Sequence, residues 1–170
     1  MKYLVGYSEE MVKQVHALVQ QNRLGEVLLQ KYSATHDIRS DKALFSFVIE
    51  LKSQYLRNAP VPSKVLFDND IRLVRRALGT HTAISRIQGG KLKAKNEIRI
   101  ASLFKDVPLA FLRMITVHEL AHLKEKDHNK AFYNLCLSME PAYHQIELDV
   151  RLYLTYMDNF GALDWQAARA

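Results

Sequence analysis

The sequence of 170 residues predicts a single α+β domain, residues 1–170, in which a small antiparallel sheet lies between N-terminal and C-terminal helices. Three observations support this prediction. Apolar residues recur every three or four positions in residues 1–60 and again in residues 106–160, which is the period of a helix. Residues 64–104 instead contain short β-branched runs and a Gly-Gly pair, which are typical of strands and turns. A chain of this length can bury one sizeable core.

Residues 1–60 are expected to be helical. Ser8, followed by two glutamates, is a typical helix start, and Ser40-Asp41 is a second one. Gly25 is expected to interrupt the first helical pattern. The second helix is expected to end before Asn58-Ala59-Pro60, and its apolar residues recur at helical spacing: Leu44, Phe47, Val48, Leu51 and Tyr55.

Residues 64–104 are expected to form the small sheet. Residues 64–67 and 71–78 each favour a strand or a mixed element, and residues 98–100 favour a returning strand. Residues 82–87 favour a further strand, which ends at the turn signal Gly89-Gly90. Strands that return after such turns pair with opposite directions, so we expect the sheet to be antiparallel.

Residues 106–160 are expected to be helical again. Asp106 is a candidate cap and Pro108 suits a first helical turn. Asn129 is a candidate cap for a further helix that runs through Met139. A last helix is expected to end near Gly161, and its apolar positions are Ile146, Val150, Leu154 and Met157.

The cysteine content and the absence of long apolar runs exclude several classes of protein. Cys136 is the only cysteine, which excludes a disulfide framework and a cysteine-rich zinc site and fits a reducing compartment. No run of residues resembles a signal peptide or a membrane span. We therefore expect a soluble, cytoplasmic protein that does not associate with membranes.

The positive charge is concentrated in one segment. The chain has a formal net charge of +6, but residues 60–105 alone contain 10 basic and 3 acidic side chains, a balance of +7. A surface of this sign attracts anionic partners such as phosphates or nucleic acid. The simpler interpretation is a basic face that contacts only solvent.

The stretch VHELAHLKEKDH, residues 117–128, predicts a metal site. On a helix, residues four positions apart lie on one face, so His118 and His122 can both bind one ion, at about 2.0–2.1 Å if the ion is Zn²⁺. Glu119 lies one position further round the helix, where it can accept a proton without binding the metal. In this motif the metal lowers the pKa of a coordinated water and polarises the substrate, while the glutamate is the general base. The alternative is a helix whose histidines have ordinary structural partners.

The third metal ligand is less clear from the sequence. His128 is the favoured candidate, but in an unbroken helix the six residues from His122 to His128 would rotate it by about 240° away from His122, so the chain must turn back. This stretch has no glycine, and Asp127 is expected to make the turn in a left-handed conformation. Glu147 is a rival ligand, and Glu125 is either a ligand or a residue that orients a histidine.

Residues 76–143 resemble the YgjP-like metallopeptidase family, which is related in outline to SprT-type zinc proteases. The resemblance is strongest in HELAHLKEKDHNKAFYNL, where the family has HELAH, a short polar run, another histidine and a phenylalanine followed by an aromatic residue. It implies a zincin-like fold, a Zn²⁺ ion bound by His118, His122 and His128, and Glu119 as the catalytic base. Phe132 and Tyr133 match a pair of helical packing positions.

The resemblance also implies where substrates bind. In such folds the strand before the motif borders the cleft, so Arg99 either faces the substrate or lies in solvent. Several later side chains are possible donors to a developing oxyanion, although ordinary packing roles are simpler for each: Tyr143, His144, Arg151, Tyr153 and Tyr156.

Three functions follow as hypotheses. The leading one is a zinc-dependent metallopeptidase that cleaves an amide bond of a peptide or protein with a metal-activated water. The second is a metal-dependent nucleoside triphosphate pyrophosphatase, since pyrophosphatase activity has been proposed within the YgjP-like family and the basic segment suits a nucleotide. The third is a basic module that binds nucleic acid and contains a structural metal.

Overall fold

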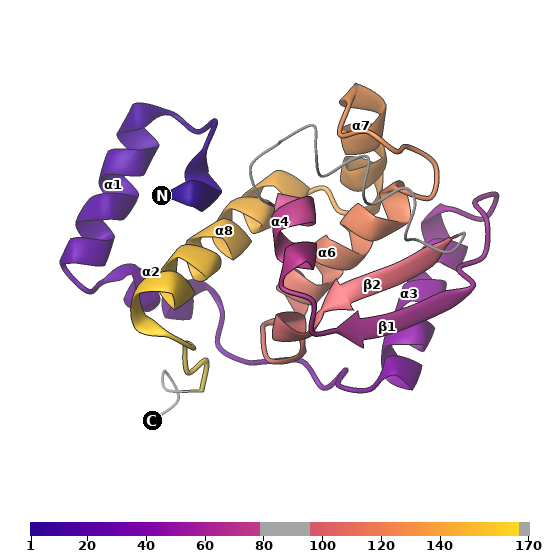
Figure 1. The fold of residues 1–170 in the computed structure, drawn as a ribbon, viewed down its shortest axis with the longest axis horizontal. Helices are drawn as coiled ribbons and strands as arrows, with labels where there is room; N and C mark the ends of the chain where they lie inside the picture. Colours follow the sequence, from indigo (N-terminus) through magenta and orange to yellow (C-terminus); the bar gives the residue numbers. More distant parts are fainter. Residues whose placement is uncertain (79–95, 167–170) are drawn as a thin grey trace.

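We describe the chain from a computed structural model, which defines residues 1–78 and 96–166. It is a helix-rich α and β structure with one small sheet (Figure 1). The order along the chain is η1 (Lys2–Leu4), α1 (Glu9–Gln20), α2 (Leu24–Lys31), α3 (Asp41–Tyr55), β1 (Lys64–Asp68), α4 (Arg72–Leu78), β2 (Glu97–Ala101), η2 (Ser102–Lys105), α6 (Leu109–Ala121), α7 (Lys130–Met139) and α8 (Tyr143–Phe160).

The two described strands, β1 and β2, are parallel, so the prediction of an antiparallel sheet is wrong. Lys64 lies opposite Glu97 and Asp68 opposite Ala101. Parallel strands need a crossover connection of a dozen or more residues, and α4 lies in that connection. The strand predicted for residues 82–87 and the turn at Gly89-Gly90 lie outside the described residues.

Residues 71–78 were expected to be a strand or a mixed element, and they form helix α4 instead. Asp70 precedes the helix, and its carboxylate accepts a hydrogen bond from the Arg72 amide at 2.9 Å. Val74, Ala77 and Leu78 are buried at the three- and four-residue spacing of a helix. A short apolar run can adopt either structure, and here packing against β2 decides for the helix.

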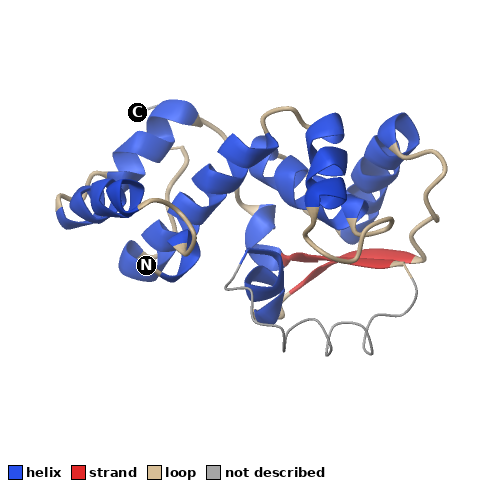
Figure 2. Ribbon diagram, turned by 90° about the horizontal axis from the view of Figure 1, so that it is seen from above, coloured by secondary structure: helices blue, strands red, loops and turns tan. Residues whose placement is uncertain are grey.

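The helices that contact the sheet lie mainly over one side of it (Figure 2). Helix α3 packs against β1, and α6 packs against β2. Helix α4 lies near the carboxyl ends of the strands (Figure 1). Helix α6 is almost wholly buried, which explains its nearly continuous apolar sequence from Phe111 to Val117.

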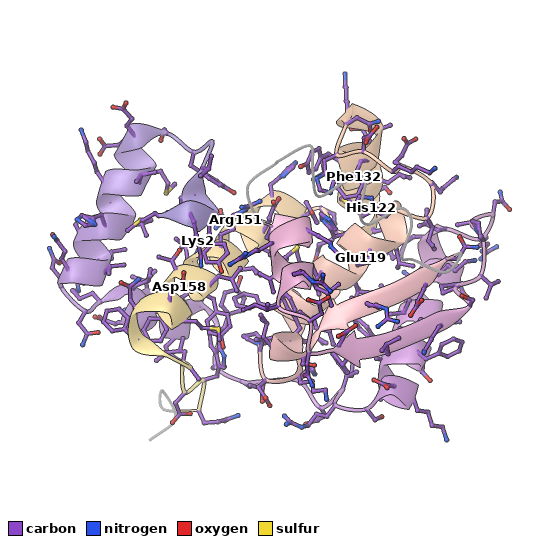
Figure 3. All side chains as sticks on the ribbon, in the orientation of Figure 1. Lys2, Glu119, His122, Phe132, Arg151 and Asp158 are labelled. Atoms are coloured by element: carbon purple, nitrogen blue, oxygen red, sulfur yellow. The ribbon has the colours of Figure 1, made fainter. Side chains whose placement is uncertain are left out.

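The N-terminal helices pack against the long helix α8 (Figure 1). The buried carboxylate of Asp149 accepts hydrogen bonds from the Tyr32 hydroxyl at 2.6 Å and from Lys31 Nζ at 3.0 Å. Near the carboxyl end of α8, Asp158 pairs with Lys2 at 3.0 Å (Figure 3). These contacts hold residues 1–31 to the domain. No helix in the described part of the chain is long and apolar enough to cross a membrane.

Three predicted helix starts are confirmed by hydrogen bonds. The Ser8 hydroxyl accepts from the Met11 amide at 3.2 Å, and the Ser40 hydroxyl accepts from the Ala43 amide at 3.1 Å. The Asn129 side chain accepts from the Phe132 amide at 2.9 Å. Each bond satisfies an amide that has no partner within its own helix.

Two other expectations about helix boundaries are wrong. Asp106 does not cap α6, because the helix begins only after Pro108, whose carbonyl accepts the first amide bond from Phe111 at 3.0 Å. Gly25 lies within α2, and the preceding break occurs at Asn22, which has a positive φ of 54°. Gly25 is needed there for a close approach, since a Cβ would lie 2.8 Å from the Tyr156 ring.

Candidate metal centre

The first two histidines of the motif lie at the carboxyl end of α6. His118 and Glu119 are in its last turn, and His122 follows it directly. The His122 amide donates to the His118 carbonyl at 3.3 Å, so both rings emerge from the same side of the helix. His118 is buried, and Figure 3 shows Glu119 and His122 at this end of α6.

The chain returns to the helix end without a left-handed residue. The helix closes with hydrogen bonds from the Leu123 amide to Leu120 at 3.0 Å and from the Glu125 amide to Ala121 at 3.0 Å. A tight turn from Asp127 to Asn129 follows, closed by a 2.8 Å hydrogen bond. Among the described residues other than glycine, only Asn22 and Asn96 have positive φ, so the left-handed conformation expected for Asp127 is wrong.

This turn brings the third histidine back to the first two. His122 Nε2 lies 3.2 Å from His118 Nε2 and 3.0 Å from His128 Nε2, and one ligand atom from each ring lies within 4.8 Å of the others. Three nitrogens bound at about 2.0–2.1 Å in a tetrahedral arrangement are about 3.4 Å apart. The cluster therefore has the size that one metal ion requires, with little rearrangement.

The opposite ring nitrogens of two histidines have hydrogen-bond partners. His122 Nδ1 lies 2.9 Å from the Glu125 carbonyl, and His118 Nδ1 lies 2.8 Å from the Tyr143 hydroxyl. A carbonyl can only accept, so the proton of neutral His122 is on Nδ1. Its Nε2 then carries a lone pair directed at the cluster, as a metal ligand requires.

Tyr143 was a candidate oxyanion donor, but its hydroxyl lies beside His118 Nδ1, the ring nitrogen that faces away from the histidine cluster. Its ring is fully buried, and burial raises the pKa of the hydroxyl well above its usual value. The same hydroxyl is hydrogen-bonded to Cys136. Burial also raises the pKa of the Cys136 thiol to about 12, so the thiol stays protonated and unreactive near neutral pH.

Neither rival ligand belongs to the histidine cluster. The Glu147 carboxylate accepts a hydrogen bond from Arg151 Nη2 at 2.8 Å, and both side chains are buried. Glu125 contacts His122 through its backbone carbonyl and not through its carboxylate. In the part of the chain that the structure describes, the group that could hold a metal consists of His118, His122 and His128.

Phe132 forms the apolar wall of the cluster. Its fully buried ring lies 4.9, 4.6 and 4.8 Å from the rings of the three histidines, measured between centroids (Figure 3). The ring keeps water from that side of the histidines and restricts their orientation. The sequence indicated a packing position here, but its contact with all three histidines depends on how α7 packs against α6.

Glu119 borders a small, partly open cavity between α4, β2 and α6. Arg99 is its other charged residue, and its apolar wall consists of Leu73, Val74, Ala77, Ala101, Phe104 and Ile115. Arg99 therefore lies on the same side of β2 as the candidate base. Its guanidinium pairs with Asp68 at 2.5 Å and with Glu97 at 2.5 Å, and the Arg99 hydrogen bond lowers the pKa of Asp68.

Comparisons with known families and proteins show what this chain resembles. The YgjP-like metallopeptidase domain matches residues 85–151. The UTP pyrophosphatase of Escherichia coli strain K12 is 59% identical over 155 residues, which cover 91% of this chain and 93% of that protein. No solved structure matches. The family and the histidine cluster are consistent with an enzyme that is a metal-binding hydrolase. The similarity extends over nearly the whole length of both proteins, and this chain belongs to the YgjP-like family.

Proposed function

We propose that this chain is a metal-dependent hydrolase that cleaves nucleoside triphosphates, UTP among them, to the nucleoside monophosphate and pyrophosphate. The observation that supports hydrolysis is the convergence of three histidine nitrogens next to Glu119 in the sequence motif. The substrate class is taken from the UTP pyrophosphatase that is 59% identical to this chain. The amide substrate that the sequence alone favoured becomes the second candidate.

In this proposal His118, His122 and His128 bind one divalent cation through their Nε2 atoms, and Zn²⁺ is the first candidate. Imidazole nitrogens suit zinc and several other transition metals, so the donor set alone leaves the choice open. When bound, the cation supplies a lowered water pKa and neutralises charge on the substrate. Phe132 and the partners of the Nδ1 atoms hold the rings in place for it.

Glu119 acts as the general base in the proposed reaction. Its carboxylate takes a proton from the attacking water as the water oxygen bonds to the α-phosphorus. The bond from the α-phosphorus to the bridging oxygen breaks, and pyrophosphate leaves with that oxygen and its electron pair. Glu119 then returns the proton to the leaving group, so that it is ready for the next cycle.

The charges around the site suit a polyphosphate. Histidines are neutral ligands, so they do not offset the charge of a divalent cation. All three acidic residues of the basic segment are already paired with arginines: Asp68 and Glu97 with Arg99, and Asp70 with Arg72. Arg75 and Arg76 of α4 add positive charge near the cavity beside Glu119.

The test is release of pyrophosphate from UTP by protein that is first stripped with a chelator and then loaded with zinc, manganese or magnesium. Glu119→Gln is expected to keep its metal and to lose turnover by about 10²–10⁴-fold, since it loses only the base. Glu125→Gln is the matched control, because the Glu125 carboxylate does not belong to the cluster. The proposal fails if no loaded form releases pyrophosphate, or if Glu119→Gln turns over like the wild type.

The second candidate is hydrolysis of an amide, in the manner of a metallopeptidase. This candidate is favoured by the HELAH sequence at the end of α6 together with a third histidine. A metal ion held by these histidines can polarise a carbonyl as well as a phosphate. The same loaded preparations are to be incubated with an unfolded protein such as reduced casein. New peptide termini without pyrophosphate release from UTP would favour this candidate over the first.

A further inference from the structure

We propose that Tyr143 is a positioning residue for the metal site: its hydroxyl fixes the tautomer of His118 and adds no negative charge to the site. This inference rests on the proposed metal ligation and deepens the proposed choice of an anionic substrate. It starts from one contact, the 2.8 Å distance between the Tyr143 hydroxyl and His118 Nδ1.

The contact joins residues from three different helices. His118 lies on α6, Tyr143 begins α8, and the Tyr143 hydroxyl is also hydrogen-bonded to Cys136 of α7. Tyr143 and Cys136 are both fully buried, and His118 nearly so. No bulk water can therefore replace the phenol as a partner, and the hydroxyl is held from both sides.

The direction of the hydrogen bonds follows from the ligand role of His118. Nε2 of a neutral imidazole can bind a cation only if the proton is on Nδ1. Nδ1–H then donates to the Tyr143 oxygen, and the Tyr143 O–H is left to donate to the Cys136 sulfur. In this series of hydrogen bonds His118 donates to Tyr143, and Tyr143 donates to Cys136. The lone pair of His118 Nε2 therefore remains directed at the cluster.

The charge of the partner matters as much as its position. Metal-binding histidines often donate to a carboxylate, which adds a negative charge beside the site and raises the basicity of the ligand. Here His118 meets a neutral phenol, and His122 meets the neutral backbone carbonyl of Glu125. A bound cation would keep more of its positive charge, which favours a substrate with several negative charges such as a triphosphate.

The first test reads the tautomer of His118 in metal-free protein by ¹⁵N NMR of the histidine rings. The wild type is expected to carry the His118 proton on Nδ1. Tyr143→Phe keeps the ring and removes the acceptor, so the proton is expected to move, at least in part, to Nε2. A wild-type His118 protonated on Nε2 overturns the inference, and so does a tautomer that Tyr143→Phe leaves unchanged.

The second test measures metal affinity by competition with a chromophoric chelator. Loss of a hydrogen bond to a metal-binding histidine commonly weakens metal binding by about 10–100-fold. The loss of affinity in Tyr143→Phe is expected to lie in this range. Tyr153→Phe is the matched control, since Tyr153 is a second buried tyrosine of α8, and its ring packs against Trp165 at 5.1 Å between centroids, away from the cluster. Equal losses in the two variants, or no loss in Tyr143→Phe, contradict a positioning role.

Neither test uses a nucleotide. If the tautomer and the affinity change as expected and UTP is not hydrolysed, the proposed substrate is wrong and the role of Tyr143 stands. If UTP is hydrolysed and Tyr143→Phe binds metal like the wild type, the role of Tyr143 is wrong and the proposed function stands.

Discussion

Replacing Arg151 by methionine should destabilise the protein and leave its metal content unchanged. Arg151 is buried in α8 and makes three hydrogen bonds: to the Glu147 carboxylate at 2.8 Å, to the Tyr3 carbonyl at 2.9 Å and to the Leu78 carbonyl at 2.6 Å. These bonds join α8 to the N-terminal segment and to the end of α4. Methionine fills much of the same volume but pairs with none of these groups.

The expected cost comes mainly from Glu147, which would be left buried without its partner. Removing one member of a buried ion pair typically costs about 3–5 kcal/mol, because the remaining charge has lost its water as well as its partner. The pair itself contributes less than this. The double variant Arg151→Met, Glu147→Leu contains neither charge of this pair. Most of the lost free energy of unfolding should therefore be recovered.

The assay is urea denaturation of the metal-free proteins, with metal stoichiometry of the loaded proteins measured alongside. The free energy of unfolding is expected to be highest for the wild type, lower for the double variant and lowest for Arg151→Met. A loss below about 1 kcal/mol in Arg151→Met would contradict this prediction, since it would mean that Glu147 finds water or another partner. If the double variant, once folded, bound no metal, Glu147 would be a ligand after all.

Two further predictions concern the neighbours of the site. The Cys136 thiol has a pKa raised by burial to about 12, so it stays protonated in the folded state while the unfolded thiol ionises above about 9. The unfolded state then binds fewer protons, and stability should fall by up to about 1.4 kcal/mol per pH unit between pH 9 and 12. Urea titrations at pH 8 and pH 10.5 should show a smaller fall in Cys136→Ala than in the wild type, and equal falls would contradict the assignment. Asn129→Ala removes the cap of α7 next to His128 and should cost about 1 kcal/mol of stability and weaken metal binding. Chelator competition checks this, and the control Ser40→Ala should lose similar stability through α3 but no metal affinity.

The parts of the fold that the sequence predicted are those fixed by local chemistry. Ser8, Ser40 and Asn129 cap helices because a side-chain oxygen satisfies an amide three residues later, which the local sequence determines. The position of His118 and His122 at one helix end likewise follows from helical spacing. For such features a single sequence is sufficient.

Most of the incorrect predictions concern features that depend on distant parts of the chain, and the one for Asp127 has a local cause. The direction of β2 relative to β1 depends on the connection between them, and residues 71–78 could not be recognised as its helix from their apolar run alone. Asp127 needs no left-handed conformation, because the helix end already turns by hydrogen bonds from residues 123–125. Tyr143 reaches His118 only because α8 packs against α6, a contact that no local pattern encodes.

In the proposed function, His118, His122 and His128 together bind one metal ion. The decisive measurement is elemental analysis of chelator-stripped protein that is reloaded separately with zinc, manganese or another divalent metal and then freed of excess metal by gel filtration. We expect one ion per wild-type chain, a large loss of metal in His128→Ala, and an unchanged metal content in Glu147→Gln. A wild type that retains no zinc, manganese or other divalent metal would contradict the claim, as would a full complement of metal in His128→Ala with a loss in Glu147→Gln.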